Sequence, residues 1–152
     1  MTGNGMGHIP ERNFTGMKIG CTAGLGQYDK IGHIAEAGFD YVETSLVSLY
    51  NASEDEISRF TEVLDDHGIV CTAANGLFPS GMMLTGDGFN GSVIEDYLNI
   101  AFDKAARVGI DTVAFACGAS RRVPREVDRR KVALEQLEEV CLHYLSPVAR
   151  KN

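Results

Sequence analysis

The sequence has no run of consecutive apolar residues long enough for a transmembrane helix, which needs about eighteen or more. Its start also lacks the order of basic residues followed by apolar ones that marks a secretory signal. From these two absences we expect a cytoplasmic protein without a membrane partner. Low-complexity tracts are absent as well, and 152 residues with 44% hydrophobic content are enough for one globular domain with a core.

Basic residues are outnumbered, and closely spaced cysteines are missing. Fourteen basic against 21 acidic residues give a net charge of -7, so the surface should repel polyanions, which excludes a nucleic-acid partner. The four cysteines have no C-x-x-C pair and fit neither a zinc site nor a disulfide framework. We expect reduced, buried thiols at Cys21, Cys71, Cys117 and Cys141.

Short β-branched or aromatic runs alternate with longer segments of helical period, which is typical of repeated β-α units and a parallel sheet. The predicted strands span residues 17–22, 39–45, 69–74 and 112–117, and a helix follows each. Residues 1–16 have no periodicity and are interpreted as a flexible leader or a misplaced start, because Met17 opens the first strand-like run.

The starts of two helices carry recognisable signals. Ser53 with Glu56, and Ser92 with Glu95, have capping-box spacing at the starts of the second and third helices. The fourth helix is predicted from about residue 128, and Pro147 is expected to kink or tighten its last turns.

A repeated phrase places one glycine between a helix and the next strand, at Gly38, Gly68 and Gly109. We predict that these glycines end their helices in the left-handed conformation. The chain stops at VARKN, where the phrase would next supply a fifth strand, whereas the closed barrel of such units has eight strands. The prediction is therefore an α/β fold of the parallel (β/α) TIM-barrel type with about four β-α units over residues 17–152. This would be a half barrel, and we expect roughly half of the parent protein to be absent.

In barrels of this type the functional side chains lie at the C-terminal ends of the strands. Glu43 stands near the second end, where a carboxylate is costly unless it is solvated, paired or used. We favour substrate contact over a structural carboxylate held by a neighbouring amide or base. Asn75 begins an unusually long loop, AANGLFPSGMMLTG, and its amide can bond a sugar hydroxyl. Asn75-Gly76 is equally a turn dipeptide, which needs no substrate to explain it.

The fourth strand end reads FACGASRRVP. Its small residues, Gly118 among them, allow close approach of the backbone to a ligand, and Arg121 and Arg122 follow. Guanidinium groups above a barrel mouth suit a phosphate or carboxylate. For Arg122 a surface ion pair is the favoured interpretation.

Histidine is missing from every predicted strand end. His8 lies in the leader, and the other three lie in helical stretches, at His33, His67 and His143. A single strand-end carboxylate gives too few ligands for a divalent metal. We therefore predict neither a catalytic residue nor a metal site within this chain.

Taken in order, the phrases GFDYVETSL, AANGLFP with LTG, IEDYL, VAFACGASRRVP and ALEQLEE resemble the sugar-phosphate isomerase/epimerase family of xylose isomerase-like TIM barrels. The resemblance spans Met17 to the C-terminus. It implies isomerisation or epimerisation of a sugar or small hydroxy-keto acid through a metal-held enediolate. It also implies a divalent metal (Mn, Mg, Co or Zn) in the full-length protein, with ligands and bases from the fifth to eighth strands.

Only pocket-lining or loop-shaping positions of the family pattern fall within this chain: Glu43, Asn75, Gly118 and Arg121. The chain departs from the pattern at Cys117, where the family often has serine. By this interpretation the chain is the N-terminal part of an enzyme, inactive alone, that would take a small sugar or sugar phosphate as substrate.

Two alternatives compete with an enzyme fragment. One is a non-catalytic half-barrel binding or assembly module that self-associates through its open sheet edges. The inward positions of its strands would lack partners, so we expect a dimer or an aggregation-prone monomer. The other is the related DNA-repair endonuclease branch, which the net charge of -7 disfavours.

Overall fold

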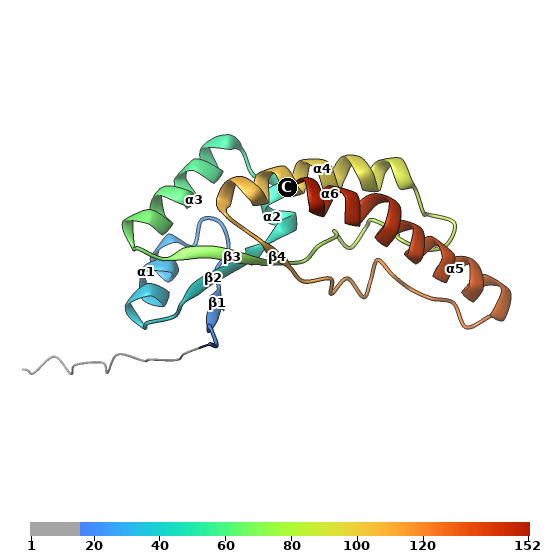
Figure 1. Cartoon of the computed structure of the whole chain (residues 1–152), viewed down its shortest axis with the longest axis horizontal. Coiled ribbons are helices and arrows are strands. Elements are labelled where there is room, and N and C mark those ends of the chain that lie inside the picture. The colour runs from blue at the N-terminus through green and yellow to red at the C-terminus, as the bar shows by residue number, and fades with distance from the viewer. Residues whose placement is uncertain (1–15) are drawn as a thin grey trace, which may run out of the picture.

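The computed structural model describes residues 16–152, in which strands and helices alternate along the chain (Figure 1). The predicted leader lies outside the described residues except for Gly16, which is exposed. The elements are β1 (Gly20–Thr22), α1 (Tyr28–Glu36), β2 (Tyr41–Ser45), α2 (Leu46–Asn51), α3 (Glu54–Asp66), β3 (Val70–Asn75), α4 (Gly91–Val108), β4 (Thr112–Val113), α5 (Val127–Glu139), a π-helical segment (Val140–Leu145) and α6 (Ser146–Lys151).

The strands form one four-stranded sheet in the order β1-β2-β3-β4, and every neighbouring pair is parallel. The predicted α/β fold with about four β-α units is confirmed. Residue Glu43 of β2 lies opposite Thr22 of β1 and Ala73 of β3, and Ser45 lies opposite Asn75. A register shift between Val42 and Glu43 interrupts the β2–β3 ladder. The carboxyl ends of the strands therefore meet along one edge, as a barrel requires.

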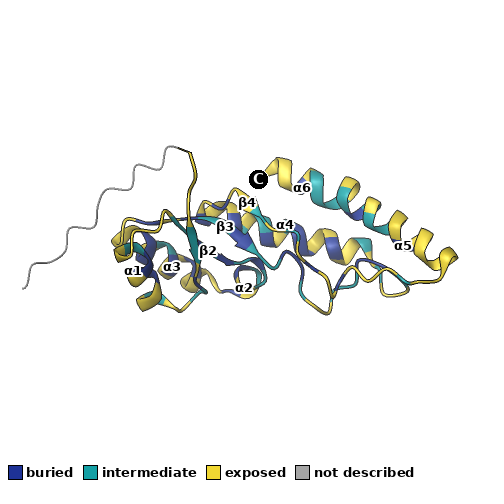
Figure 2. Ribbon diagram, turned by 90° about the horizontal axis from the view of Figure 1, so that it is seen from below, coloured by how far each residue is buried: buried dark blue, intermediate teal, exposed yellow. Residues whose placement is uncertain are grey.

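Helices cover one face of the sheet, and the core lies between the two layers (Figures 1 and 2). In β2, Val42 and Thr44 are fully buried, whereas the alternate residues Tyr41, Glu43 and Ser45 remain partly exposed. Because successive strand residues point to opposite faces, the second set lies on the face that would line a barrel interior. The largest fully buried apolar side chains are Phe60, Ile31, Leu46, Leu49, Leu77, Leu84, Ile94 and Leu98.

Three helices end in the same way, as the repeated glycine phrase predicts. Gly38, Gly68 and Gly109 have φ angles of 78°, 63° and 95°, all left-handed. The residue after each glycine donates its N–H to a carbonyl five positions earlier, as Phe39 does to Ile34. These are Schellman motifs, which satisfy the last carbonyls of the helix and direct the chain into the next strand.

The two helix starts with capping-box spacing differ in the structure. Ser53 caps α3, and Glu56 returns a bond to the Ser53 N–H at 2.8 Å, so this capping box is confirmed. The prediction at Ser92 is wrong, because α4 begins earlier and Asn90 caps it by accepting from the Val93 N–H. Ser92 instead donates its hydroxyl to Asn90 Oδ1 at 2.9 Å.

The outer strands are shorter than the sequence predicts. The predicted strand over 17–22 is a strand only over Gly20–Thr22, and the one over 112–117 only over Thr112–Val113. The central strands β2 and β3 begin within two residues of their predicted starts and reach or pass their predicted ends. The difference follows from position, because an outer strand has a hydrogen-bonding partner on one side only.

The C-terminal helical stretch is distorted before Pro147, but it widens into a π-helix, whereas the sequence predicted a kink or a tightening of its last turns. The six residues Val140–Leu145 form a π-helical segment directly before α6, in which Pro147 occupies one of the first helical positions. Proline has no N–H to donate and crowds the preceding turn, so local widening accommodates it. In this stretch Leu134 is 49% exposed, whereas Val148 is buried.

Candidate functional site

Glu43 and Asn75 lie side by side at the carboxyl ends of β2 and β3. The Asn75 amide Nδ2 donates to Glu43 Oε1 at 2.5 Å, a bond between residues 32 positions apart in the chain. Both side chains are half-buried. The structure thus brings together two of the four predicted site residues, and the neighbouring-strand amide that we weighed as a structural partner for Glu43 is Asn75 itself.

The turn after Asn75 agrees with the dipeptide signal. Gly76 has a φ of 64°, a left-handed conformation that glycine adopts without strain. The chain then runs without helix or strand from residue 76 to residue 90, confirming the long loop. Its first part is anchored in the core, because Phe78 is 5% exposed and its ring packs 5.9 Å from that of Tyr97.

Gly118 and Arg121 lie in the loop after β4, and no contact joins either of them to the Glu43–Asn75 pair. Gly118 is exposed, with no heavy atom near the position that a Cβ would occupy. The Arg121 guanidinium carbon lies 5.6 Å from the centre of the Phe115 ring, within cation–π range. Arg122 is exposed too. The predicted site residues therefore form one pair and one separate exposed loop.

Hydrogen bonds that sequence patterns did not reveal tie the two long loops together. The Leu84 N–H donates to the Ser120 carbonyl at 2.8 Å, and the Ser120 hydroxyl donates to the Pro79 carbonyl at 3.0 Å. From α5, the Gln136 side chain accepts from the Gly86 N–H and donates to its carbonyl. No local pattern in the sequence could indicate these bonds, because the partners are about forty to fifty positions apart.

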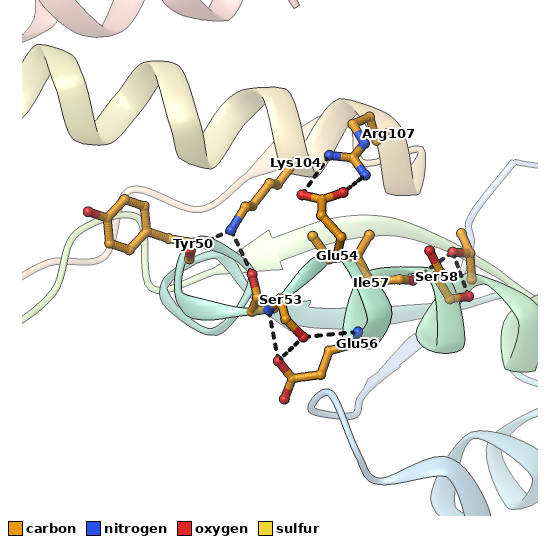
Figure 3. A network of polar contacts seen from close by, with 10 residues as sticks. Tyr50, Ser53, Glu54, Glu56, Ile57, Ser58, Lys104 and Arg107 are labelled. Atoms are coloured by element: carbon orange, nitrogen blue, oxygen red, sulfur yellow. Dashed lines mark hydrogen bonds and ion pairs between the residues drawn. The ribbon is translucent and has the colours of Figure 1, made fainter.

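A polar network joins α2, α3 and α4 on the helical side of the fold (Figure 3). Lys104 donates to the carbonyls of Tyr50 and Ala52 at 2.8 and 2.7 Å, which caps the C-terminus of α2. Arg107 pairs with both carboxylate oxygens of Glu54. The hydrogen bond from Arg107 lowers the pKa of Glu54 and in turn raises the pKa of Arg107. The Lys104 ammonium on α4 therefore stabilises the end of a neighbouring helix.

All four cysteines are unpaired, as expected, but only two of them are buried. Cys71 and Cys117 are buried, whereas Cys21 and Cys141 are partly exposed. Desolvation raises the pKa of Cys71 to about 12, so it remains a thiol. Cys117 Sγ accepts from the Phe78 N–H at 3.2 Å. This bond shows that the thiol can hold the turn where the family pattern often has serine.

No group of three or more His, Cys, Asp or Glu side chains within residues 16–152 is placed to hold a metal ion. Over the same residues, no helix has both the length and the apolar character to cross a membrane. A largely apolar hollow of about 370 Å³ lies between α4, α6 and the start of the loop after β4, and Val113, Phe115 and Leu145 line it. This hollow was not predicted.

The sequence matches no family model, and no curated protein matches it significantly. Several solved structures have a similar fold, and three sugar epimerases are among them. D-Psicose 3-epimerase, in the presence of D-fructose, aligns with a TM-score of 0.64 and 15% identity over 89% of this chain and 49% of its own. 3-Keto-D-glucoside 4-epimerase from E. coli aligns with a TM-score of 0.56 and 21% identity over 89% of this chain and 52% of its own. D-Allulose 3-epimerase from Methylomonas sp. aligns with a TM-score of 0.57 and 14% identity over 88% and 49%.

At these identities the likeness establishes the fold, which is a partial (β/α) TIM barrel. The chain spans about half the length of the structures that it matches.

Proposed function

We propose that this chain is the N-terminal part of a sugar or sugar-phosphate isomerase or epimerase, in which Glu43 and Asn75 contact the sugar. The observation that carries the proposal is the bond between these two side chains, at the carboxyl ends of adjacent parallel strands. Both belong to the sheet face that helices leave uncovered. The fold shared with three sugar epimerases supports the substrate class.

The chemistry of the pair suits hydroxyl recognition. An asparagine amide has two N–H donors and one carbonyl acceptor, and a carboxylate has only acceptors. The bond at 2.5 Å uses one donor of Asn75 and orients both groups, which leaves donor and acceptor positions for two sugar hydroxyls. We assign this pair to substrate positioning. The proton transfers of an enediolate reaction would belong to strands beyond these four.

The resemblance to metal-dependent enzymes implies a divalent metal for a full-length protein. Residues 16–152 do not fit such an ion by themselves, because they bring no three ligand side chains together. We therefore assign no step to a metal here. Gly118 and Arg121 are proposed to shape and charge the loop that would receive a substrate phosphate, if the sugar carries one.

The side-chain amide of Asn75 provides a direct test. D-Fructose and D-psicose are titrated into the ¹⁵N-labelled 152-residue chain, and side-chain amide signals are followed by NMR, with Asn75→Asp to assign the Asn75 pair. We expect the Asn75 signals to shift, because a sugar hydroxyl would change their hydrogen bonding. Asn51 and Asn99 are internal references, because their amides donate to carbonyls of their own helices.

Two variants that each remove one negative charge distinguish an effect at the proposed site from an effect at the protein surface. Glu43→Gln should weaken the sugar-dependent shift of Asn75 at least several-fold, whereas Glu36→Gln, at an exposed position on α1, should leave it unchanged. Shifts of similar size at all asparagines, or none at Asn75 at sugar concentrations that saturate related enzymes, would reject the proposal.

The alternative function is a non-catalytic half-barrel assembly module that associates through its open sheet edges. One observation favours it, namely that both outer strands are shorter than their sequences predict. If the sugar titration fails while the chain forms a defined assembly, this alternative becomes the better account.

A further inference from the structure

Ser45 ends β2 beside the Glu43–Asn75 pair. It follows Glu43 by two positions on the same strand and lies opposite Asn75 in the parallel register. Alternate residues of a strand point to the same face, and neighbouring strands are about 4.8 Å apart, so the three side chains share one corner of the uncovered sheet face. Ser45 is half-buried, as Glu43 and Asn75 are. A ligand that contacts the pair is therefore within reach of the Ser45 hydroxyl.

The Ser45 hydroxyl has a hydrogen to donate. Its oxygen accepts from the Ser48 N–H at 3.3 Å and so caps α2. A serine hydroxyl has one donor and two acceptor positions, and the cap uses one of the acceptor positions. The cap thus orients the oxygen and leaves the O–H hydrogen available. An ionised carboxylate such as that of Glu43 has only acceptors, so Ser45 adds a donor that the pair needs to bind two hydroxyls.

The turn after β3 keeps space beside this hydroxyl. Gly76 has a φ of 64°, and a Cβ at that position would lie 3.5 Å from Ser45 Oγ. A side chain there would therefore be in contact with the hydroxyl. The left-handed conformation favours glycine, which has no side chain to place beside Ser45. The dipeptide Asn75-Gly76 thus turns the chain and also leaves room for a ligand at Ser45.

From these features we infer that Ser45 is a third sugar-contacting residue and that the site binds two hydroxyls on adjacent sugar carbons. One hydroxyl donates to Glu43 and accepts from the remaining N–H of the Asn75 amide. Its neighbour donates to the Asn75 side-chain carbonyl and accepts from the Ser45 O–H. Each sugar hydroxyl then uses both its donor and an acceptor position. This inference rests on the proposed contact of Glu43 and Asn75 with a sugar.

The dissociation constants of D-fructose and D-psicose, measured from the shift of the Asn75 amide signals, test the role of Ser45. Ser45→Ala should raise the constants about fivefold, the ratio that corresponds to one neutral hydrogen bond. Ser45→Thr keeps a hydroxyl that can cap and donate, so it should bind with nearly the wild-type constants.

Ser53→Ala is the matched control for the loss of a helix cap. Ser53 caps α3 by accepting from the Glu56 N–H at 3.3 Å, the same distance as in the Ser45 cap, and it lies in the polar network on the helical side of the fold (Figure 3). This variant should lose a cap of the same kind and leave both dissociation constants unchanged. Circular dichroism verifies that each variant is folded.

Monodeoxy analogues of the two sugars separate a contact from a cap. The analogue without the hydroxyl that Ser45 contacts should bind the wild type and Ser45→Ala equally, whereas the other analogues should keep the difference between them. A purely structural serine would give the same difference with every analogue.

The outcomes distinguish this inference from the proposed function. The inference is overturned by equal sugar constants in the wild type and Ser45→Ala, by an equal weakening in Ser53→Ala, or by a difference that persists with every analogue. In each of these cases Asn75 still responds to the sugar, so the proposed function stands. Wild-type Asn75 signals that respond to neither sugar would reject the proposed function, and this inference with it.

Discussion

The hydrogen bond from Asn75 to Glu43 is compatible with both roles considered for Glu43 from the sequence, a structural carboxylate and a substrate contact. It holds the ends of β2 and β3 together, and it leaves a half-buried, oriented acceptor on the open face of the sheet. A hydrogen bond to a charged group stabilises a fold more than one between neutral groups. Loss of the Asn75 amide should therefore lower the stability of the chain even when no ligand is present.

Replacing Asn75 with leucine tests the structural share of this bond. We expect Asn75→Leu to lower the free energy of unfolding by about 1 to 2 kcal/mol, because Glu43 loses its partner in a partly desolvated position. Urea unfolding at neutral pH measures the change. Asn99→Leu is the control, since that amide only bonds a carbonyl of its own helix, and an equal loss in the two variants would contradict the assignment.

Cysteine reactivity should follow burial. Cys71 is desolvated, which raises its pKa to about 12, and it remains protonated where an exposed thiol ionises. A thiol reagent at pH 8 should modify Cys21 and Cys141 well before Cys71, as followed by mass spectrometry of digested protein. Because the folded-state pKa lies above the ordinary value of 9.0, stability should also fall as pH rises past 9. Early modification of Cys71 in the native chain would show that this strand opens readily.

At the scale of elements, helix ends determine where each β-α unit begins and stops. The same serine-to-glutamate spacing occurs at the starts of α3 and α4, yet only Ser53 forms a capping box. At α4, Asn90 accepts a hydrogen bond from the Val93 N–H and is therefore the N-cap in place of Ser92. An asparagine side chain caps a helix at least as well as a serine side chain does. The spacing from serine to glutamate alone could not decide between two candidate capping residues that lie two positions apart.

The two candidate caps of α4 can be ranked by substitution. Asn90→Ala should destabilise the chain by about 1 kcal/mol, the usual cost of losing an N-cap. Ser92→Ala should cost a few tenths of that, since its hydroxyl bonds Asn90 and no backbone N–H. Thermal unfolding of both variants measures the difference, and a larger effect at Ser92 would restore the cap that the spacing predicted.

The capping box of α3 should make stability depend on pH. The backbone hydrogen bond from Ser53 lowers the pKa of Glu56 below its ordinary value of 4.5. A lowered folded-state pKa means that the stabilisation is complete above about 4.5 and is lost as pH falls through the folded value. Glu56→Gln should therefore be less stable than the wild type at pH 7 and equal to it near pH 2. Glu138→Gln, at an exposed position on α5, should show no such convergence.

At the scale of the whole molecule, the sequence predicts the parts of the fold that local pattern controls. The glycine phrases located three helix ends, and the central strands β2 and β3 appeared close to their predicted residues. The short helix α2 was missed, because its six residues directly follow β2 and are too few to show a helical period. The outer strands were overestimated because strand formation there needs a partner that no local pattern supplies.

The candidate site was predictable to the same extent. Strand-end position identified Glu43 and Asn75, but nothing local indicated that they would bond each other across 32 positions. The bonds between the two loops, such as that from Gly86 to Gln136, join residues 50 positions apart and depend on the packing of α5. Long-range pairing of this kind depends on how the sheet and helices pack. The sequence pattern could therefore identify the candidate residues but not the residues to which they bond.

The central proposal is that these four β-α units contact a sugar, while the groups that move its proton belong to other strands. One experiment tests both parts. The 152-residue chain is incubated with D-fructose and the diamagnetic ion Mg²⁺ in a D₂O–H₂O mixture that contains enough H₂O to observe the amide. The Asn75 amide and the sugar are then followed together by NMR. The account predicts that Asn75 shifts with sugar concentration while no deuterium enters the carbon positions beside the carbonyl. Deuterium incorporation that depends on the protein, or sugar that leaves Asn75 unaffected, would contradict it.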